Sequence, residues 1–318
     1  MPSGIRPLCT FFSGSIVGSN RPCGQDSAGR PDEREALAGV RPQRNSLLAS
    51  GSVFDCRRLG DRCSLGKKLG MTIVLVHGIP ETEAIWDDLV PHLRDDDIVR
   101  LSPPGFGSVI PAGFDCSIDA YRDWLAGELE KLAQPIDLVG HDWGGGHVMR
   151  IAMDRPDLIR SWTADVLGVL DPDYVWHDLA QAWQTPEIGE QAVAQMVGMP
   201  AEARAKQYDS LGMTSAIAEK VAAGANAEMG RAILALYRSA AQPVMRELGT
   251  GLPRAAAKPG LALIATEDSY CGGETLARRS AERAGAKVAV LEGAGHWWMC
   301  QQPKQGADAI NAFLAELN

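Results

Sequence analysis

The segment Gly140-His141-Asp142-Trp143-Gly144-Gly145 constrains the fold most, because it joins an apolar run to a helical pattern. Residues 136–139 read as a short buried strand, and a helix follows through about Asp154. Glycines on both sides of Asp142 permit a cramped turn that projects the middle side chain at the end of the strand. The sequence therefore predicts a strand–turn–helix unit that presents a carboxylate, where such elbows usually carry serine.

The chain from Met71 onward alternates strand and helix patterns, which predicts an α/β fold with a mostly parallel sheet flanked by helices. Residues 171–250 break this rhythm, since they are rich in Ala, Gln, Glu and Met at helical spacing, and we expect a helical insertion there. Predicted strands cover residues 72–76, 98–101, 136–139, 161–168, 261–265 and 287–291, and further helices cover residues 117–133 and 304–317.

Residues 1–70 differ from the rest in composition. They hold 11 Lys and Arg against 6 Asp and Glu, whereas the whole chain carries a net charge of −9. They are rich in Ser, Gly, Arg and Pro and keep no helical or strand period, which predicts a disordered leader or a non-native N-terminal extension before a domain at 71–318. Met71 directly precedes the first strand, so a native start at Met71 is our hypothesis.

Charge, cysteines and hydropathy exclude several classes of function. The net charge of −9 argues against a nucleic-acid or anionic-membrane surface, and no apolar run reaches the ~18 residues of a membrane span. The seven cysteines show no metal-ligand spacing, so we expect the reduced thiols of a cytoplasmic protein. The histidines lack zinc spacing and the glycines lack a dinucleotide fingerprint, so we expect no metal and no cofactor.

Two further motifs follow predicted strands. His77-Gly78-Ile79-Pro80 follows the first strand, where the backbone N–H groups of Ile79 and Trp143 can face a developing negative charge together. His296 lies in a glycine-containing turn after the last strand. An acid that orients this histidine is expected after another strand; Asp268 fits best, and Asp165 stays open as the alternative.

On these motifs, residues 71–318 resemble the α/β-hydrolase superfamily, in its branch of epoxide hydrolases and haloalkane dehalogenases. The motif at 141–145 is typical of that branch, and residues 77–81 with Trp86 are most similar to the epoxide hydrolase version. The resemblance implies the α/β-hydrolase fold, a helical cap at about 171–250, and a catalytic triad of Asp142, Asp268 and His296 in the order nucleophile, acid, histidine.

A carboxylate nucleophile suits sp³ carbons. Attack of Asp142 on an ester carbonyl would give an anhydride, whereas attack on an epoxide or alkyl halide gives an ordinary alkyl ester. His296, oriented by Asp268, can then activate the water that hydrolyses this ester. We therefore predict a hydrolase that opens a small apolar epoxide to a diol with water.

The leaving group separates the alternatives. An opening epoxide needs a proton donor, and the resemblance implies Tyr237 and His177 of the cap for that role. A leaving halide needs N–H donors instead, which Trp143 with Trp176 or Trp183 can supply, so a haloalkane dehalogenase stays an alternative. His77 is a further candidate for the oxyanion or substrate site. A non-catalytic, hydrolase-like ligand-binding protein and a homodimer also stay open.

Overall fold

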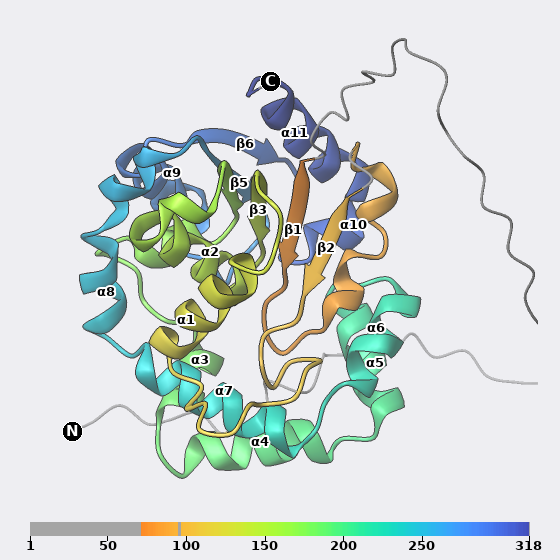
Figure 1. Ribbon diagram of the computed structural model, residues 1–318. Helices are drawn as coiled ribbons and strands as arrows, with labels where there is room; N and C mark the ends of the chain where they lie inside the picture. The colour runs from red at the N-terminus through yellow and green to blue at the C-terminus, as the bar shows by residue number, and fades with distance from the viewer. Residues whose placement is uncertain (1–70, 95–96, 318) are drawn as a thin grey trace, which may run out of the picture. The chain divides into compact units, whose positions relative to one another are not determined.

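The computed structural model describes residues 71–94 and 97–317, and the predictions for residues 1–70 fall outside the described residues. Six strands form one sheet in the order β2-β1-β3-β4-β5-β6, and every neighbouring pair is parallel (Figure 1). The strands are β1 (Thr72–Val76), β2 (Ile98–Leu101), β3 (Ile136–Gly140), β4 (Ser161–Ala164), β5 (Gly260–Ala265) and β6 (Lys287–Leu291).

Helices occupy most of the remaining described chain. The α-helices are α1 (Ile118–Leu129), α2 (Trp143–Asp154), α3 (Asp178–Gln184), α4 (Ile188–Gly198), α5 (Ala201–Ser210), α6 (Ser215–Ala223), α7 (Ala227–Ser239), α8 (Val244–Gly249), α9 (Gly273–Arg283), α10 (Trp298–Gln301) and α11 (Pro303–Ala315). Short 3-10 helices are η2 (Glu83–Trp86), η3 (Val90–His92), η4 (Pro156–Leu158), η5 (Leu167–Leu170) and η6 (Leu252–Ala257). None of the described helices has the length and apolar character needed to cross a membrane.

Both faces of the inner strand β1 are buried. Ile73 and Leu75 join one apolar cluster, which includes residues of α10 and α11. Val74 and Val76 join the other cluster, which includes residues of α1 and α2. Successive side chains of a strand point to opposite faces, so a continuous apolar run is what a strand covered on both sides requires. The predicted parallel sheet with helices on both faces is thereby confirmed.

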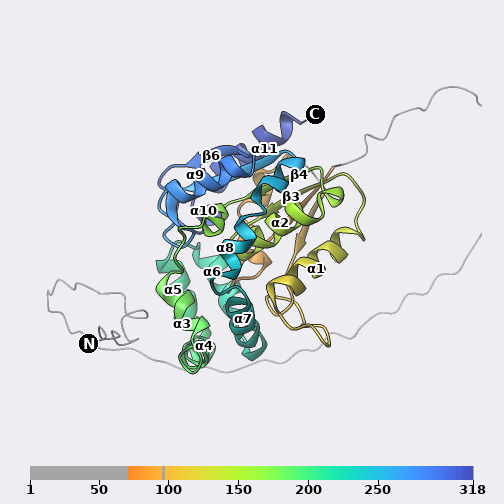
Figure 2. The same ribbon diagram turned by 90° about the vertical axis from the view of Figure 1, so that its left-hand side faces the viewer.

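The helices α3 to α8 lie between β4 and β5 in the chain, in the span where the sequence predicts a cap. Helices α3, α4 and α7 lie together beyond one end of the sheet in both views (Figures 1 and 2). The buried Arg204 of α5 ties neighbouring helices together, because its guanidinium donates hydrogen bonds to the carbonyls of Met196, Met199 and Ala222. These carbonyls lie at or next to the C-terminal ends of α4 and α6, where the regular hydrogen bonds of a helix run out.

One strand is shorter than predicted. The sequence suggests residues 161–168, but β4 ends at Ala164 and η5 begins at Leu167. The chain leaves the sheet at Asp165, whose carboxylate accepts a hydrogen bond from the backbone N–H of Asp142 at 3.0 Å. The apolar pattern continues through Val166 and Leu167, but the hydrogen bond between Asp165 and Asp142, which follows β3, accompanies the end of β4 at Ala164.

Candidate active site

Asp142 lies at a strained turn between β3 and α2. Its backbone has φ 50° and ψ −125°, a conformation that L-residues rarely adopt. The turn needs glycine around it: a Cβ on Gly144 would lie 2.1 Å from the carbonyl oxygen of Val76, and one on Gly78 would lie 2.4 Å from the Asp142 side chain. The two glycines let the backbone close tightly around one carboxylate.

The Asp142 carboxylate is held by backbone donors. The N–H of Ile79 donates to Asp142 Oδ1 at 3.0 Å, and the backbone N–H of Trp143 forms a second hydrogen bond that favours the ionised carboxyl. These are the two N–H groups that the sequence places at the oxyanion position. The structure thus brings Ile79 and Trp143 to the same carboxylate.

The other oxygen faces His296. His296 Nε2 lies 3.9 Å from Asp142 Oδ2, which is too long for a direct hydrogen bond. His296 Nδ1 lies 2.9 Å from Asp268 Oδ2, so Asp268 fixes the ring with Nε2 directed toward Asp142. The structure brings Asp142, His296 and Asp268 together in the geometry that a nucleophile–base–acid triad needs.

Asp165, the alternative acid, lies behind Asp142. Its Oδ1 accepts the backbone N–H of Asp142, and its Oδ2 lies 2.6 Å from His141 Nδ1 and accepts the indole N–H of Trp298 at 2.7 Å. These contacts direct Asp165 toward His141, and the acid hydrogen-bonded to His296 is Asp268. The assignment depends on side-chain direction, which strand order alone does not reveal.

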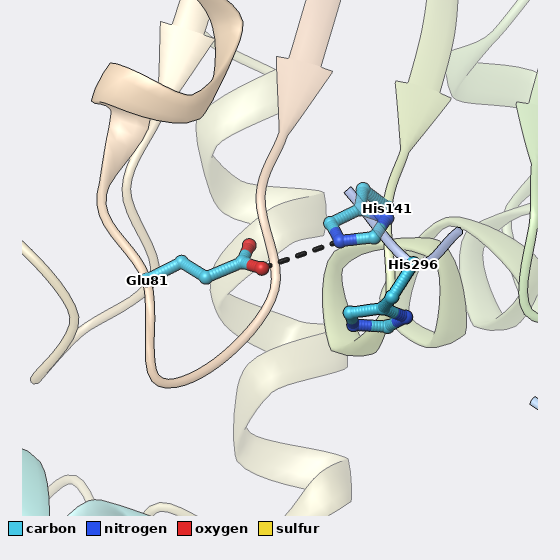
Figure 3. Close-up of side chains that lie close together, drawn as sticks. All are labelled: Glu81, His141 and His296. Atoms are coloured by element: carbon cyan, nitrogen blue, oxygen red, sulfur yellow. Dashed lines mark hydrogen bonds and ion pairs between the residues drawn. The ribbon is translucent and has the colours of Figure 1, made fainter. Parts of the chain in front are cut away.

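Glu81 completes a buried charge network that the sequence alone does not reveal. Its carboxylate reaches from the loop after β1 to His141 Nε2 at 3.2 Å, while the His296 ring lies beside His141 (Figure 3). Glu81 also accepts the N–H of Gly78 at 3.0 Å and the indole N–H of Trp297. The motif at 77–81 contains Glu81, but only the fold shows that it is fully buried.

The network holds opposite charges. Burial lowers the pKa of His141, but the charges of Asp165 and Glu81 outweigh it and raise that pKa well above its usual value. Burial likewise opposes ionisation of Glu81, but His141 lowers the pKa of Glu81 to about 2. His141 is therefore an imidazolium clamped between two carboxylates, close to the His296 ring, with 4.6 Å between ring centroids.

Glu81, His141 and His296 are close enough for their ligand atoms to surround an ion, all within 4.8 Å of one another. The donor set does not suit a metal, however. An imidazolium offers no lone pair, and both nitrogens of His141 already face carboxylates. We therefore interpret this cluster as an internal ion network.

Asp142 and His296 have shifted pKa values. Burial raises the pKa of Asp142 to about 6, although the charges of His296 and His141 oppose this shift. Burial lowers the pKa of His296, but the charge and hydrogen bond of Asp268 outweigh it, so the net pKa of His296 lies above its usual value. At neutral pH Asp142 is therefore mostly ionised.

A small cavity, here called the inner cavity, adjoins Asp142. Its volume is about 20 Å³, and its walls include Trp143, Trp176, Tyr237 and His177. One water needs roughly 10–15 Å³, so the inner cavity holds about one water. The Tyr237 ring packs edge-on against Trp143, with centroids 5.3 Å apart, which brings Tyr237 of α7 next to the turn that carries Asp142.

His177 reaches the inner cavity in a defined tautomer. Its Nδ1 accepts the N–H of Ala180 at 3.2 Å, and burial lowers its pKa to about 4. The ring is thus neutral near pH 7 and carries its proton on Nε2. By contrast, the Tyr174 hydroxyl already donates to the Tyr270 carbonyl, and His77 is fully buried and lies outside the residues that line the inner cavity.

The family follows from a comparison with known families. The model of the alpha/beta hydrolase family matches residues 73–309. This chain belongs to the alpha/beta hydrolase family. The match covers the described sheet and the site at its carboxyl edge.

Curated relatives overlap with part of the chain. A haloalkane dehalogenase 2 of Mycobacterium bovis is 28% identical over 206 residues, covering 62% of this chain and 65% of that protein. The AB hydrolase superfamily protein YfhM of Bacillus subtilis is 25% identical over 181 residues, covering 52% and 60%. A probable oxidoreductase EphD of Mycobacterium tuberculosis is 32% identical over 142 residues, covering 41% of this chain and only 23% of that protein. This chain thus spans less than two thirds of the length of each.

Solved structures share the fold. Haloalkane dehalogenase DbeA from Bradyrhizobium elkani superposes with a TM-score of 0.61 at 19% identity, covering 79% of this chain and 92% of that chain. Epoxide hydrolase A from Mycobacterium thermoresistibile superposes with a TM-score of 0.62 at 20% identity, with the same coverage. At such identity the likeness establishes the α/β-hydrolase fold.

We predict that Glu81→Gln destabilises the protein by about 3 kcal/mol at pH 7, because it leaves the buried His141 charge with one carboxylate. Folding lowers the pKa of Glu81 from 4.5 to about 2, so its stabilisation is present above pH ~4.5 and is lost as the pH falls toward 2. Urea unfolding should show this difference shrinking over that range, while exposed Glu83→Gln changes stability by less than about 0.5 kcal/mol. A difference that does not vary with pH would contradict the ionised state of Glu81.

Proposed function

We propose that this protein hydrolyses epoxides through a covalent ester on Asp142. The observation that carries the proposal is the placement of the Asp142 carboxylate: Oδ1 is held by the N–H of Ile79, and Oδ2 faces His296 at 3.9 Å. A carboxylate so placed is ionised, oriented and next to a base. A carboxylate that attacks an ester carbonyl forms an anhydride, whereas one that attacks an sp³ carbon forms an ordinary ester. A carboxylate in the nucleophile position therefore favours a substrate with an sp³ reacting carbon.

In the first step Asp142 Oδ2 attacks an epoxide carbon, and the C–O bond of the ring breaks. The released alkoxide needs a proton or a strong hydrogen bond, for which Tyr237 and the Nε2–H of His177 are at hand in the inner cavity. Burial and the Asp142 charge hold the pKa of Tyr237 well above its usual value, so its hydroxyl keeps its proton at neutral pH. The step yields a hydroxyalkyl ester of Asp142.

In the second step His296 Nε2 takes a proton from water, and the hydroxide oxygen attacks the ester carbonyl carbon. The oxyanion then forms on Oδ1, against the N–H groups of Ile79 and Trp143. On collapse the bond from the carbonyl carbon to the substrate oxygen breaks, and that oxygen takes the proton back from His296 Nε2 and leaves with the diol. The carboxyl of Asp142, now with one oxygen from water, loses its proton, which replaces the one given to the alkoxide in the first step. The charge and hydrogen bond of Asp268 are the main causes that raise the pKa of His296, and the Asp142 charge adds to them. Ester formation removes the Asp142 charge, so the pKa of His296 falls in the intermediate that needs a free base.

One observation favours haloalkane dehalogenation as the second candidate. The indole N–H of Trp176 is buried, lines the inner cavity and has no hydrogen-bond partner among the described residues. The indole N–H of Trp183 is also buried without a partner there. An unpaired indole N–H beside the nucleophile suits a leaving halide, whereas the Tyr237 hydroxyl suits an alkoxide.

The His296→Ala variant tests the proposal, because without its base the enzyme should stop at the ester. We expect mass spectrometry after incubation with styrene oxide to find the mass of the whole epoxide on the peptide that contains Asp142, close to one per chain. Exposed His92→Ala is the matched control and should turn over without a stable adduct. A 1-bromobutane adduct that lacks bromine, with no epoxide adduct, would instead favour the dehalogenase.

The pKa of Asp142 predicts the pH dependence of the first step. Because only the ionised carboxyl attacks and its pKa is about 6, kcat/KM for an epoxide should be constant above pH ~7 and should fall about tenfold per unit well below pH 6. Initial rates between pH 4.5 and 8, with circular dichroism to verify folding, measure this. A kcat/KM that rises as the pH falls through 6 would rule out an ionised Asp142 as the attacking group.

A further inference from the structure

A second, larger depression lies on the other side of His296. It has a volume of about 530 Å³ and is lined by His296, Tyr270, Leu211, Trp297, Glu267 and Gln301, among others. We call it the outer hollow. His296 lines the outer hollow, and its Nε2 lies 3.9 Å from Asp142 Oδ2.

Tyr270 separates the two spaces, and it is the residue that lines both. Its ring packs edge-on against His177, which lines the inner cavity, with centroids 5.1 Å apart. The same ring packs against His296, which lines the outer hollow, with centroids 4.9 Å apart. Tyr270 is therefore the partition between the nucleophile and the outer hollow.

The sizes of the two spaces restrict the substrate. The inner cavity, at about 20 Å³, has room for little more than one water. An epoxide ring is larger than one water, so a wall of the inner cavity has to move before any epoxide enters, and an epoxide with a bulky group on each carbon needs still more room. The outer hollow, at about 530 Å³, has room for a chain of many atoms. Tyr270 is half-buried and is the wall that the two spaces share, so displacement of its ring joins them and lets the rest of a long substrate lie in the outer hollow.

The lining of the outer hollow indicates the character of that extension. Leu211 is 44% exposed and offers an apolar contact, and Trp297 and Tyr270 add aromatic surface. Ser269 and Gln301 add polar groups, and Glu267 is the one carboxylate among the described residues of the lining. His296 is already paired with Asp268. The charge in the outer hollow thus favours a neutral or cationic group and disfavours an anion.

We propose that the outer hollow binds the tail of the substrate, and that the substrate is a terminal epoxide on an extended chain with a neutral or cationic, hydrogen-bonding end. This inference rests on the proposed epoxide hydrolysis and names its substrate class. Tyr270, the wall shared by the two spaces, acts as a specificity-determining residue. The Glu267 carboxylate favours a cationic tail over an anionic one.

Three terminal epoxides with equally long tails test the proposal, ending in trimethylammonium, methoxy and carboxylate groups, beside 1,2-epoxypropane. We expect kcat/KM for the cationic and neutral tails to exceed that of 1,2-epoxypropane at least about tenfold, and the anionic tail to be poorest. Glu267→Gln should reduce the cation-to-anion ratio about fivefold, as expected for one charge near the surface. Glu282→Gln, an exposed acid on α9, should leave this ratio unchanged.

Binding of the three corresponding diols, measured by calorimetry, separates the two proposals because it needs no turnover. Diols that bind with the predicted charge preference, reduced in Glu267→Gln, while no epoxide is opened, would reject the proposed function and support the outer hollow as a tail site. Epoxides that are opened with no dependence on tail length or on Glu267, in rate or in binding, would overturn the tail site.

Discussion

The left-handed backbone of Asp142 is the constraint on which the site depends. At φ 50° it costs roughly 1–3 kcal/mol, and contacts from both neighbouring strand ends must hold it. The loop after β1 supplies the Ile79 N–H to the side chain, and Asp165, directly after β4, supplies its carboxylate to the backbone N–H. Three strand ends thus converge on one residue, which explains why a parallel sheet positions it so rigidly.

The buried charges around His141 set the chemistry of the residues in front of them. The imidazolium lowers the pKa values of both Asp142 and His296. At Asp142 it opposes the effect of burial, and at His296 it opposes the effect of the Asp268 charge. Glu81 and Asp165 keep that imidazolium charged. The network therefore acts as a fixed positive charge beneath the carboxylate, and this charge favours the ionised form of the proposed nucleophile.

The sequence predicted the local features well and the long-range ones poorly. The elbow, the strand runs and the histidine turn are short patterns, so Asp142 and His296 could be named from the sequence. Asp268 was favoured over Asp165, but only the side-chain directions show that Asp268 is the acid hydrogen-bonded to His296. The Glu81–His141 pair joins residues 60 positions apart, and its charge state depends on burial that no local pattern reveals. The extent of β4 and the aromatic filling of the inner cavity likewise depend on contacts between distant segments.

The fate of oxygen in a single turnover tests the central claim most directly. With excess enzyme and an epoxide in H₂¹⁸O, an Asp142 ester predicts that the first diol carries no label and that the label enters the Asp142 carboxylate, because water attacks the carbonyl carbon. Mass spectrometry of the diol and of the peptide containing Asp142 measures both. Label in the first diol, with Asp142 unlabelled, would mean that water attacks the epoxide directly, and would contradict Asp142 as the nucleophile.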